Sequence, residues 1–250
     1  MSEVFLEVKN LCKSYPDFKL SDVSFSLSGG RIMGLIGKNG AGKSTTLKSM
    51  LNLVKPDSGS VFMLGKEFRE NEVFCKQNIG VVLGEIDFYQ HKKISDITAV
   101  TKRFYSNWDE ETYKKYIEMF ELRPEKRVKE LSSGMRVKYM IALALSHGAR
   151  LLILDEPTSG LDPVSRDDLL RLFSSLVQSG ERSILFSTHI ITDLEKCADD
   201  ISYIKQGKLL SSAPKEEFIN SFQYLKEEGE TATLGLEEIM LRCERRDYDA

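Results

Sequence analysis

The chain has 250 residues, of which 41% are hydrophobic, enough for a sizeable core in one large α/β domain or two small ones. Lys+Arg 35 against Asp+Glu 38 give a formal net charge of -3, which excludes a sequence-wide basic excess for binding nucleic acid or an anionic membrane. The four cysteines are scattered without a C-x-x-C pair, which argues against a zinc knuckle or a disulfide framework and fits a reducing cytosol. No run approaches the ~18 apolar residues of a membrane helix, so any membrane-spanning part is expected in another chain.

The N-terminal part of the sequence predicts two kinds of strand. Apolar and polar residues alternate over 4–8 and 23–27, as in half-buried antiparallel strands, and Gly29-Gly30 marks a turn after the second. Residues 32–36 form a continuous apolar run, which is typical of a strand covered on both faces. The α/β core is therefore expected to begin at this run.

Further short apolar runs predict the rest of the core. Segments long enough for crossover helices separate these runs, which indicates a mostly parallel, doubly wound sheet. The runs lie at 79–83, 151–154, 183–186 and 201–204.

Two parts of the chain have helical patterns instead. Between about 86 and 147 the sequence is charged and rich in aromatic residues, as in 111–122 with Pro124 ending that helix, and we expect an inserted helical subdomain there. From Pro214 onward two short amphipathic helices are predicted. The predicted division is a main domain over 1–212, with the insert at about 86–147, and a short helical extension over 213–250.

The motif G-x-x-x-x-G-K-[ST] occurs at residues 37–44, directly after the apolar run 32–36 and before a helical pattern. Its glycines let the backbone wrap tightly, so that amide N–H groups and a helix N-terminus face a phosphate chain. We expect Lys43 to reach the β- and γ-phosphates of a nucleotide and Ser44 to bind Mg²⁺. The alternative without a role in phosphate binding is a glycine-rich turn. The predicted nucleotide-binding residues here are Gly37, Lys38, Asn39, Gly40, Ala41, Gly42, Lys43, Ser44 and Thr45.

The apolar run 151–154 ends in two acids, Asp155 and Glu156, and Pro157 cannot continue the strand ladder. In an open parallel sheet the carboxyl ends of the strands form the ligand-binding edge. Asp155 is therefore predicted to hold Mg²⁺ and Glu156 to polarise an attacking water. Adjacent acids after a strand also occur as a simple solvated turn.

Residues 131–135, Leu-Ser-Ser-Gly-Met, resemble the LSGGQ signature of ABC (ATP-binding cassette) ATPases. Residues 159–162, Ser-Gly-Leu-Asp, resemble the D-loop of that family, His189 resembles its switch histidine, and Tyr15 stands where an adenine-stacking aromatic is expected. The resemblance covers residues 4 to about 212 and is strongest to bacterial single-cassette proteins of the ABC-2 and bacitracin-exporter kind. It implies a P-loop NTPase (RecA-like) α/β core with an N-terminal antiparallel β subdomain and an inserted α-helical subdomain.

The resemblance also implies how such a chain works. ATP is sandwiched between Lys43 of one subunit and Ser132, Ser133 and Gly134 of a second ABC subunit, in a homodimer or a heterodimer. Independently, Ser132 and Ser133 are good N-caps for a helix over about 135–146, whose N-terminus attracts an anion. The alternatives without a role in nucleotide binding are a plain capped helix, an ordinary strand-end histidine at 189 and an exposed loop tyrosine at 15.

The implied function is a Mg²⁺-dependent ATPase with Lys43, Glu156 and His189 as catalytic residues. Its partner is a transmembrane permease subunit rather than nucleic acid, which places the chain on the cytoplasmic face of the membrane. The docking surface is expected near Phe88, Tyr89 and His91, although these aromatic residues fit the core of the helical insert equally well. The cargo implied is a small molecule, a lipid or a peptide antibiotic, and export is favoured over import.

Two departures from the family pattern keep alternatives open. No glutamine follows the run 79–83, and Glu85 stands at the expected position as a candidate third Mg²⁺ ligand. Ser133 replaces a glycine, which is compatible with slow hydrolysis or with pairing to a different cassette. A cassette that binds ATP but hardly hydrolyses it, and a soluble regulatory cassette acting on ribosomes or DNA, are the competing functions.

Overall fold

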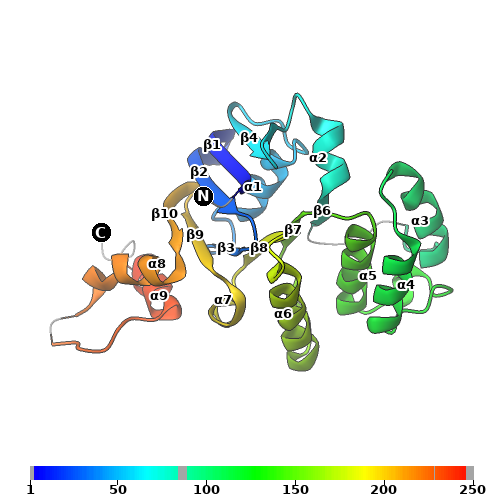
Figure 1. The fold of residues 1–250 in the computed structure, drawn as a ribbon. Coiled ribbons are helices and arrows are strands. Elements are labelled where there is room, and N and C mark those ends of the chain that lie inside the picture. The colour runs from blue at the N-terminus through cyan, green and yellow to red at the C-terminus, as the bar shows by residue number, and fades with distance from the viewer. Residues whose placement is uncertain (1–2, 84–88, 228, 246–250) are drawn as a thin grey trace.

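The computed structural model describes residues 3–83, 89–227 and 229–245. Within these residues one ten-stranded sheet runs through the molecule in the order β5-β4-β1-β2-β10-β9-β3-β8-β7-β6 (Figure 1). The strands are β1 (Val4–Tyr15), β2 (Phe18–Ser28), β3 (Ile32–Ile36), β4 (Ser58–Met63), β5 (Lys66–Glu67), β6 (Ile79–Val82), β7 (Leu151–Asp155), β8 (Ser183–Thr188), β9 (Asp200–Lys205) and β10 (Lys208–Pro214).

Helices occupy most of the intervals between strands. The α-helices are α1 (Lys43–Met50), α2 (Glu72–Asn78), α3 (Ile94–Thr101), α4 (Glu110–Met119), α5 (Ser133–Ser146), α6 (Pro163–Val177), α7 (Ile191–Cys197), α8 (Lys215–Ser221) and α9 (Leu236–Arg245). Three short 3₁₀ turns accompany them, η1 (Lys102–Phe104), η2 (Val128–Glu130) and η3 (Gln223–Leu225). In the described part of the chain, each helix is too short or too polar to cross a bilayer.

The sheet has a parallel part and an antiparallel part. Strands β6, β7, β8, β3 and β9 pair in parallel, whereas β1 pairs antiparallel with both β2 and β4. The β9–β10 hairpin joins the two parts, because β10 also pairs with β2 at Lys208 and Ser21. The predicted α/β fold class with an antiparallel N-terminal portion is confirmed, although β4, β5 and β10 were not predicted.

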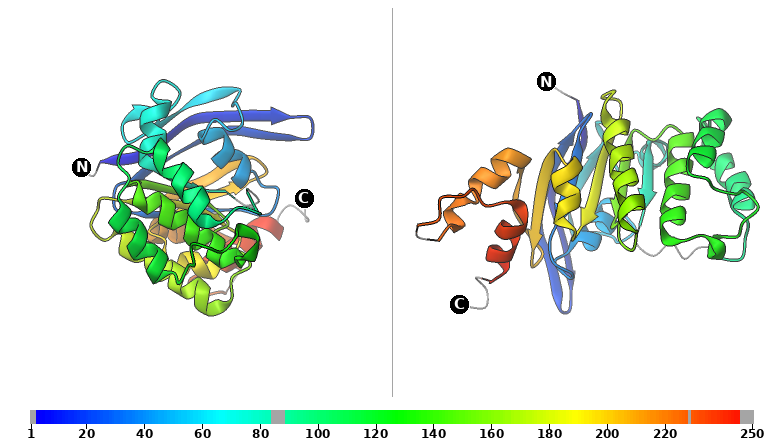
Figure 2. Two further views of the ribbon diagram at one scale, coloured as in Figure 1. Left: turned by 90° about the vertical axis from the view of Figure 1, so that its right-hand side faces the viewer. Right: turned by 90° about the horizontal axis from the view of Figure 1, so that it is seen from below.

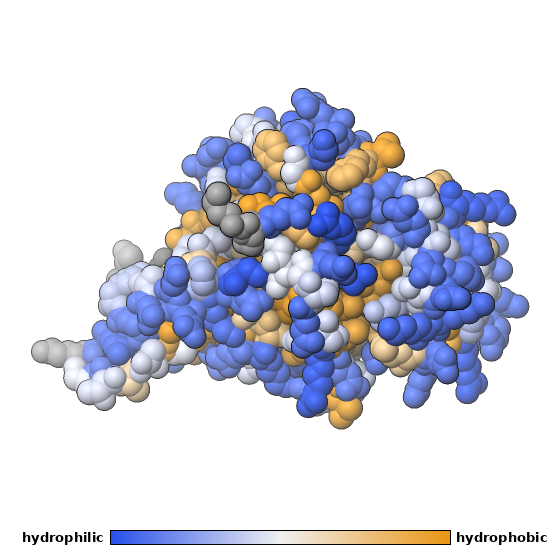
Figure 3. Space-filling view, in the orientation of Figure 1, coloured by the Kyte–Doolittle hydropathy of each residue, from blue (hydrophilic) through white to orange (hydrophobic). Residues whose placement is uncertain are grey.

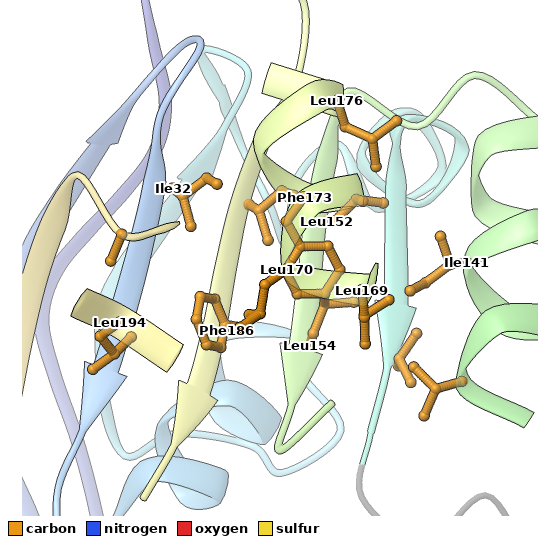
Figure 4. Packing of buried hydrophobic residues seen from close by; sticks show 14 of the residues in the cluster. Ile32, Ile141, Leu152, Leu154, Leu169, Leu170, Phe173, Leu176, Phe186 and Leu194 are labelled. Carbon is orange, nitrogen blue, oxygen red and sulfur yellow. The ribbon is translucent and has the colours of Figure 1, made fainter. Parts of the chain in front are cut away.

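The parallel strands are apolar on both faces because each face is covered. In β3, Ile32 and Ile36 join one hydrophobic cluster while Met33 and Leu35 join the other. Figure 4 shows the first cluster, where Phe173 of α6 packs against the strands. The Phe173 ring centroid lies 5.8 Å from that of Phe186 on β8. Burial of each such side chain contributes about 1.5–3 kcal/mol.

The second cluster holds the antiparallel strands against the core. Leu47 and Met50 of α1 pack there with Leu6 of β1 and Leu20 of β2. Residues 37–44, called the phosphate loop below, lead into α1, and α1 is anchored in this cluster to both β1 and β2.

The helices α3, α4 and α5 lie at one end of the molecule, and α8 and α9 lie at the opposite end (Figures 1 and 2). The buried Tyr139 hydroxyl joins α5 to α3, since it bonds to Thr98 Oγ1 at 2.9 Å and donates to the Ile94 carbonyl at 3.0 Å. The helix predicted over 111–122 begins at Glu110 and ends at Met119, and the one predicted over 135–146 begins at Ser133. The assignment of these helices to a separate subdomain stays a prediction.

His147 lies where α5 ends and the helical segment meets the core. Its side chain is 3% exposed, its ring stacks on Tyr105 with centroids 3.8 Å apart, and Nδ1 has no hydrogen-bond partner among the described residues. Burial lowers the pKa of His147 to about 4, although a hydrogen bond to the backbone of Gln77 opposes that shift. Near neutral pH the folded protein therefore holds the His147 side chain in its uncharged form.

We expect His147 to make stability depend on pH. The pKa of His147 is about 4 in the folded state and ~6.5 in the unfolded chain. The stability that the neutral side chain contributes is therefore present above pH ~6.5 and is lost as the pH falls toward ~4. The loss should approach about 3 kcal/mol. The variant H147F keeps a stackable ring without a titrating group, and urea unfolding at several pH values should show a shallower decline for it. The exposed His91 gives a matched control, H91N, and equal slopes for H147F and wild type would contradict the assignment.

Candidate nucleotide-binding site

The loop between β3 and α1 is tightly packed, and at position 37 only glycine fits. Gly37 has φ +154°, and a Cβ at this position would lie 2.3 Å from the Ile204 carbonyl oxygen of β9. Gly42 is the N-cap residue of α1 and provides no side-chain cap, so the first amide N–H groups of the helix remain available to a ligand. This glycine cradle ending in an uncapped helix fits a phosphate chain.

Three charged or titratable side chains meet beside this loop. Lys43 is 6% exposed, and its Nζ donates to the Gly37 carbonyl at 2.7 Å and lies 3.5 Å from Glu156 Oε1. His189 Nδ1 lies 2.7 Å from Glu156 Oε2. The three predicted catalytic residues come from α1, the end of β7 and the end of β8, and Glu156 bridges the other two.

The backbone of Glu156 is held in an uncommon conformation. Its φ is +51°, in the left-handed region that a glutamate rarely occupies, and its N–H bonds to both the carbonyl (3.1 Å) and the hydroxyl (3.0 Å) of Ser187. Ser187 Oγ also donates to Asp155 Oδ1 at 2.5 Å. Ser187 therefore positions both acids, a role that was not predicted because it depends on the pairing of β7 with β8.

A hollow of about 750 Å³ opens over the loop and these acids. Tyr15, Phe18, Glu156, Ser159 and His189 line it together with the phosphate loop. Tyr15 is 42% exposed and its ring centroid lies 6.5 Å from that of Phe18, so two aromatic rings stand at the mouth. Tyr15, Glu156 and His189 were predicted as site residues, and so were the residues of the loop that line the hollow, which are Lys38, Asn39, Gly40, Gly42, Lys43, Ser44 and Thr45. Asp17 and Phe18 were not predicted, and Ser159 was expected only as part of the D-loop.

Three other predicted residues do not line this hollow. Gly37 has no side chain to present, Ala41 is buried, and the buried Asp155 is bonded to Ser187. The Asp155 carboxylate and the Ser44 hydroxyl are the hard oxygen donors that Mg²⁺ prefers. Glu85, the candidate third metal ligand, lies outside the described residues.

The residues predicted to contact a partner's nucleotide form a different hollow, of about 250 Å³. Ser132, Ser133 and Gly134 line it with residues 160–162 and the end of α4. Ser132 Oγ accepts from the Met135 N–H at 3.2 Å, so Ser132 is an N-cap as expected. Ser133 does not cap the helix but begins it, and its hydroxyl donates to the Gly160 carbonyl at 3.2 Å. Of the two N-cap candidates, Ser132 is the N-cap and Ser133 is the first residue of the helix.

The two hollows share no lining residue. Within one chain, therefore, Ser132, Ser133 and Gly134 do not take part in the hollow that contains Lys43 and Glu156. The N-terminus of α5 therefore faces a hollow of its own.

Comparisons with known proteins give a consistent result. The family model described as "ABC transporter" matches residues 20–159. The chain is 33% identical over 212 residues to the bacitracin transport ATP-binding protein BcrA of Bacillus licheniformis, covering 84% of this chain and 69% of the relative. It is 35% identical over 208 residues to the lantibiotic transport ATP-binding protein SrtF of Streptococcus pyogenes, covering 82% and 89%. A solved structure of an ATP-binding subunit of an ABC transporter superposes with a TM-score of 0.82 at 26% identity, covering 95% of this chain and 98% of that one.

We expect G37A to destabilise the protein strongly, because the new Cβ would collide with the Ile204 carbonyl oxygen. Urea unfolding should show a loss of more than about 2 kcal/mol. The matched control is G40A, at φ +82° with nothing within 4 Å of its Cβ, which should lose only about 1 kcal/mol. Equal losses of unfolding free energy in the two variants would show that the collision with Ile204 of β9 does not cause the destabilisation.

Proposed function

Since this chain belongs to the ABC transporter family of ATP-binding proteins, we propose that it powers a separate transmembrane permease as one half of a nucleotide-sandwich dimer. The chain is an ATPase of a transporter, and the proposal concerns its partners, its site residues and its cargo. The observation that carries the proposal is the convergence of Lys43, Glu156 and His189 on one hollow.

The hollow accommodates ATP with its phosphates at the glycine loop. Amide N–H groups at the start of α1 and the Lys43 ammonium bind the phosphates, and Tyr15 offers a ring face on which adenine stacks. Ser44 and Asp155 would hold Mg²⁺. That ion neutralises charge on the transferred phosphoryl group when it is bound.

Glu156 is proposed as the general base for the attacking water. Its carboxylate is shared between Lys43 and His189. Phosphate oxygens give Lys43 a stronger partner, so Glu156 Oε1 becomes available to accept a proton from water. His189, 2.7 Å from Oε2, then keeps the carboxylate in orientation.

The second hollow supports the sandwich arrangement. The N-terminus of α5 carries a partial positive charge and has no acidic residue in its first turn, so it favours an anion. Lys138 lines the same hollow and adds to this attraction, whereas the carboxylates of Glu121 and Asp162 oppose it. We propose that this anion is the γ-phosphate held by Lys43 of a second cassette, contacted by Ser132, Ser133 and Gly134. Both a second copy of this chain and a different cassette fit this arrangement.

Replacing Glu156 with glutamine should lower the steady-state ATPase rate by about 10²–10³-fold, because glutamine cannot accept the proton. ATP and Mg²⁺ should then hold E156Q as a dimer, measured by analytical ultracentrifugation, whereas K43A should stay monomeric. An undiminished ATPase rate in E156Q would remove Glu156 as the base.

The control for the sandwich is the double variant S132R/E156Q. Arginine at 132 fills the second hollow and leaves the first unchanged, so the double variant should bind ATP as a monomer without dimerising. Dimerisation equal to that of E156Q would place the dimer contact elsewhere.

A surface for the permease is proposed between the core and the helical segment. Here α2 and η1 are joined, because Gln77 Nε2 donates to the Phe104 carbonyl at 2.5 Å and Gln77 Oε1 accepts from the Ser106 N–H at 3.1 Å. Large apolar side chains stand exposed on both sides of this junction, and Figure 3 shows a hydrophobic patch over α2. These exposed side chains are Val73 and Phe74 of α2, Val100 of α3 and Phe104 of η1.

This apolar surface suits a helix of the permease that lays its apolar face into a groove. Tyr89 and His91, also expected at the docking surface, are exposed, and Phe88, the third residue expected there, lies outside the described residues. Because the relatives are named for bacitracin and lantibiotic transport, we propose export of a small molecule, a lipid or a peptide antibiotic from the cytoplasmic face of the membrane.

The variant F104D should release the chain from the membrane fraction of its native cells, because a charge replaces a side chain that is 71% exposed on this surface. The purified variant should keep its intrinsic ATPase rate. The matched control is L53D, which alters another exposed apolar residue, in the loop after α1. Equal membrane association of F104D, L53D and wild type would rule this surface out.

A further inference from the structure

The helix α9 contacts the phosphate loop through the carboxylate of Glu244. Glu244 Oε2 lies 3.7 Å from the Nζ of Lys38, which is part of the loop and lines the nucleotide hollow. Glu244 Oε1 accepts from the hydroxyl of Tyr203, a fully buried residue of β9, at 2.8 Å. The Glu244 side chain is only 16% exposed, so its position is defined by the fold.

The end of α9 is also anchored to the strand that supports the loop. Lys205 Nζ, at the end of β9, donates to the Cys243 carbonyl at 2.6 Å, which places a cation at the C-terminus of the helix. The turn after β9 contacts the phosphate loop directly, because the Gly207 N–H donates to the Ala41 carbonyl at 2.8 Å. Ile239 and Cys243 bury the apolar face of α9. Thus α9 is held against β9 at the point where β9 meets the phosphate loop.

We propose that α9 is a built-in brake on nucleotide binding, in which the Glu244 carboxylate competes with the phosphates of ATP for Lys38. The inference rests on the proposed nucleotide site and adds its regulation. Glu244 acts as a positioning residue: it directs the Lys38 ammonium toward α9 and adds a negative charge beside the site of a polyanion.

The direction of the effect follows from charge. ATP is a polyanion, so a carboxylate near its phosphates opposes binding, and a lysine engaged by that carboxylate contributes less attraction. The Lys38 side chain is 56% exposed, so screening by solvent keeps the effect modest. A partner that draws α9 away from β9 would release the brake and increase the affinity for ATP.

The experiment measures the Kd for ATP with Mg²⁺ by calorimetry at low and high salt. E244Q removes the charge but keeps an oxygen that accepts from Tyr203, so the helix stays anchored. Its Kd should fall about two- to fivefold relative to wild type at low salt, and the difference should shrink at high salt. The matched control is E237Q, the same charge change on an exposed residue in the first turn of α9, which should bind like wild type.

A second comparison tests whether the effect passes through Lys38. In a K38Q background, E244Q should change the Kd much less than it does in wild type. An undiminished change there, an equal change in E237Q, or an unchanged or raised Kd in E244Q would each overturn the brake. K43A separates this from the proposed site: ATP binding that survives K43A would refute the site, whereas Lys43-dependent binding that ignores E244Q would refute only the brake.

Discussion

The burial of the central strands on both faces is the constraint on which the rest of the molecule depends. Strand β3 sends side chains into both hydrophobic clusters, so its own interior positions are apolar. The charged residues of the parallel strands lie at the ends of these strands. Lys43, Glu156 and His189 follow β3, β7 and β8 at the same edge, and Glu156 consequently lies within reach of both other residues.

Much of the fold could be predicted because buried parallel strands leave uninterrupted apolar runs, as at 32–36 and 151–154. The antiparallel strands were predicted too short, since β1 and β2 pair from Val4 to Tyr15 with register shifts that interrupt the alternation. Strand β10 was missed because none of its residues is fully buried and no apolar signal results. The edge strand β5 has only two residues, which is too short for any pattern.

The candidate site shows the same division between local and distant information. The phosphate loop and the pair Asp155 and Glu156 are contiguous in the sequence and were predicted there. The hydroxyl of Ser187 holds both acids only because β7 and β8 are neighbours. The bond from Ser133 to the Gly160 carbonyl likewise joins segments that sequence spacing does not relate. Glu244 reaches Lys38 from the far end of the chain, and no motif marks that contact.

The support of the phosphate loop also determines when the loop can take shape during synthesis. Its strand β3 pairs with β8 and β9, both of which are made much later than residues 37–44. Gly37 lies against the Ile204 carbonyl, and the Ala41 carbonyl accepts from the Gly207 N–H. A nascent chain on the ribosome therefore carries the loop sequence long before it can form the loop's conformation. ATP cannot be held in this geometry until the β9–β10 hairpin has emerged and folded, so the nucleotide site forms only after residues 200–214 have been made.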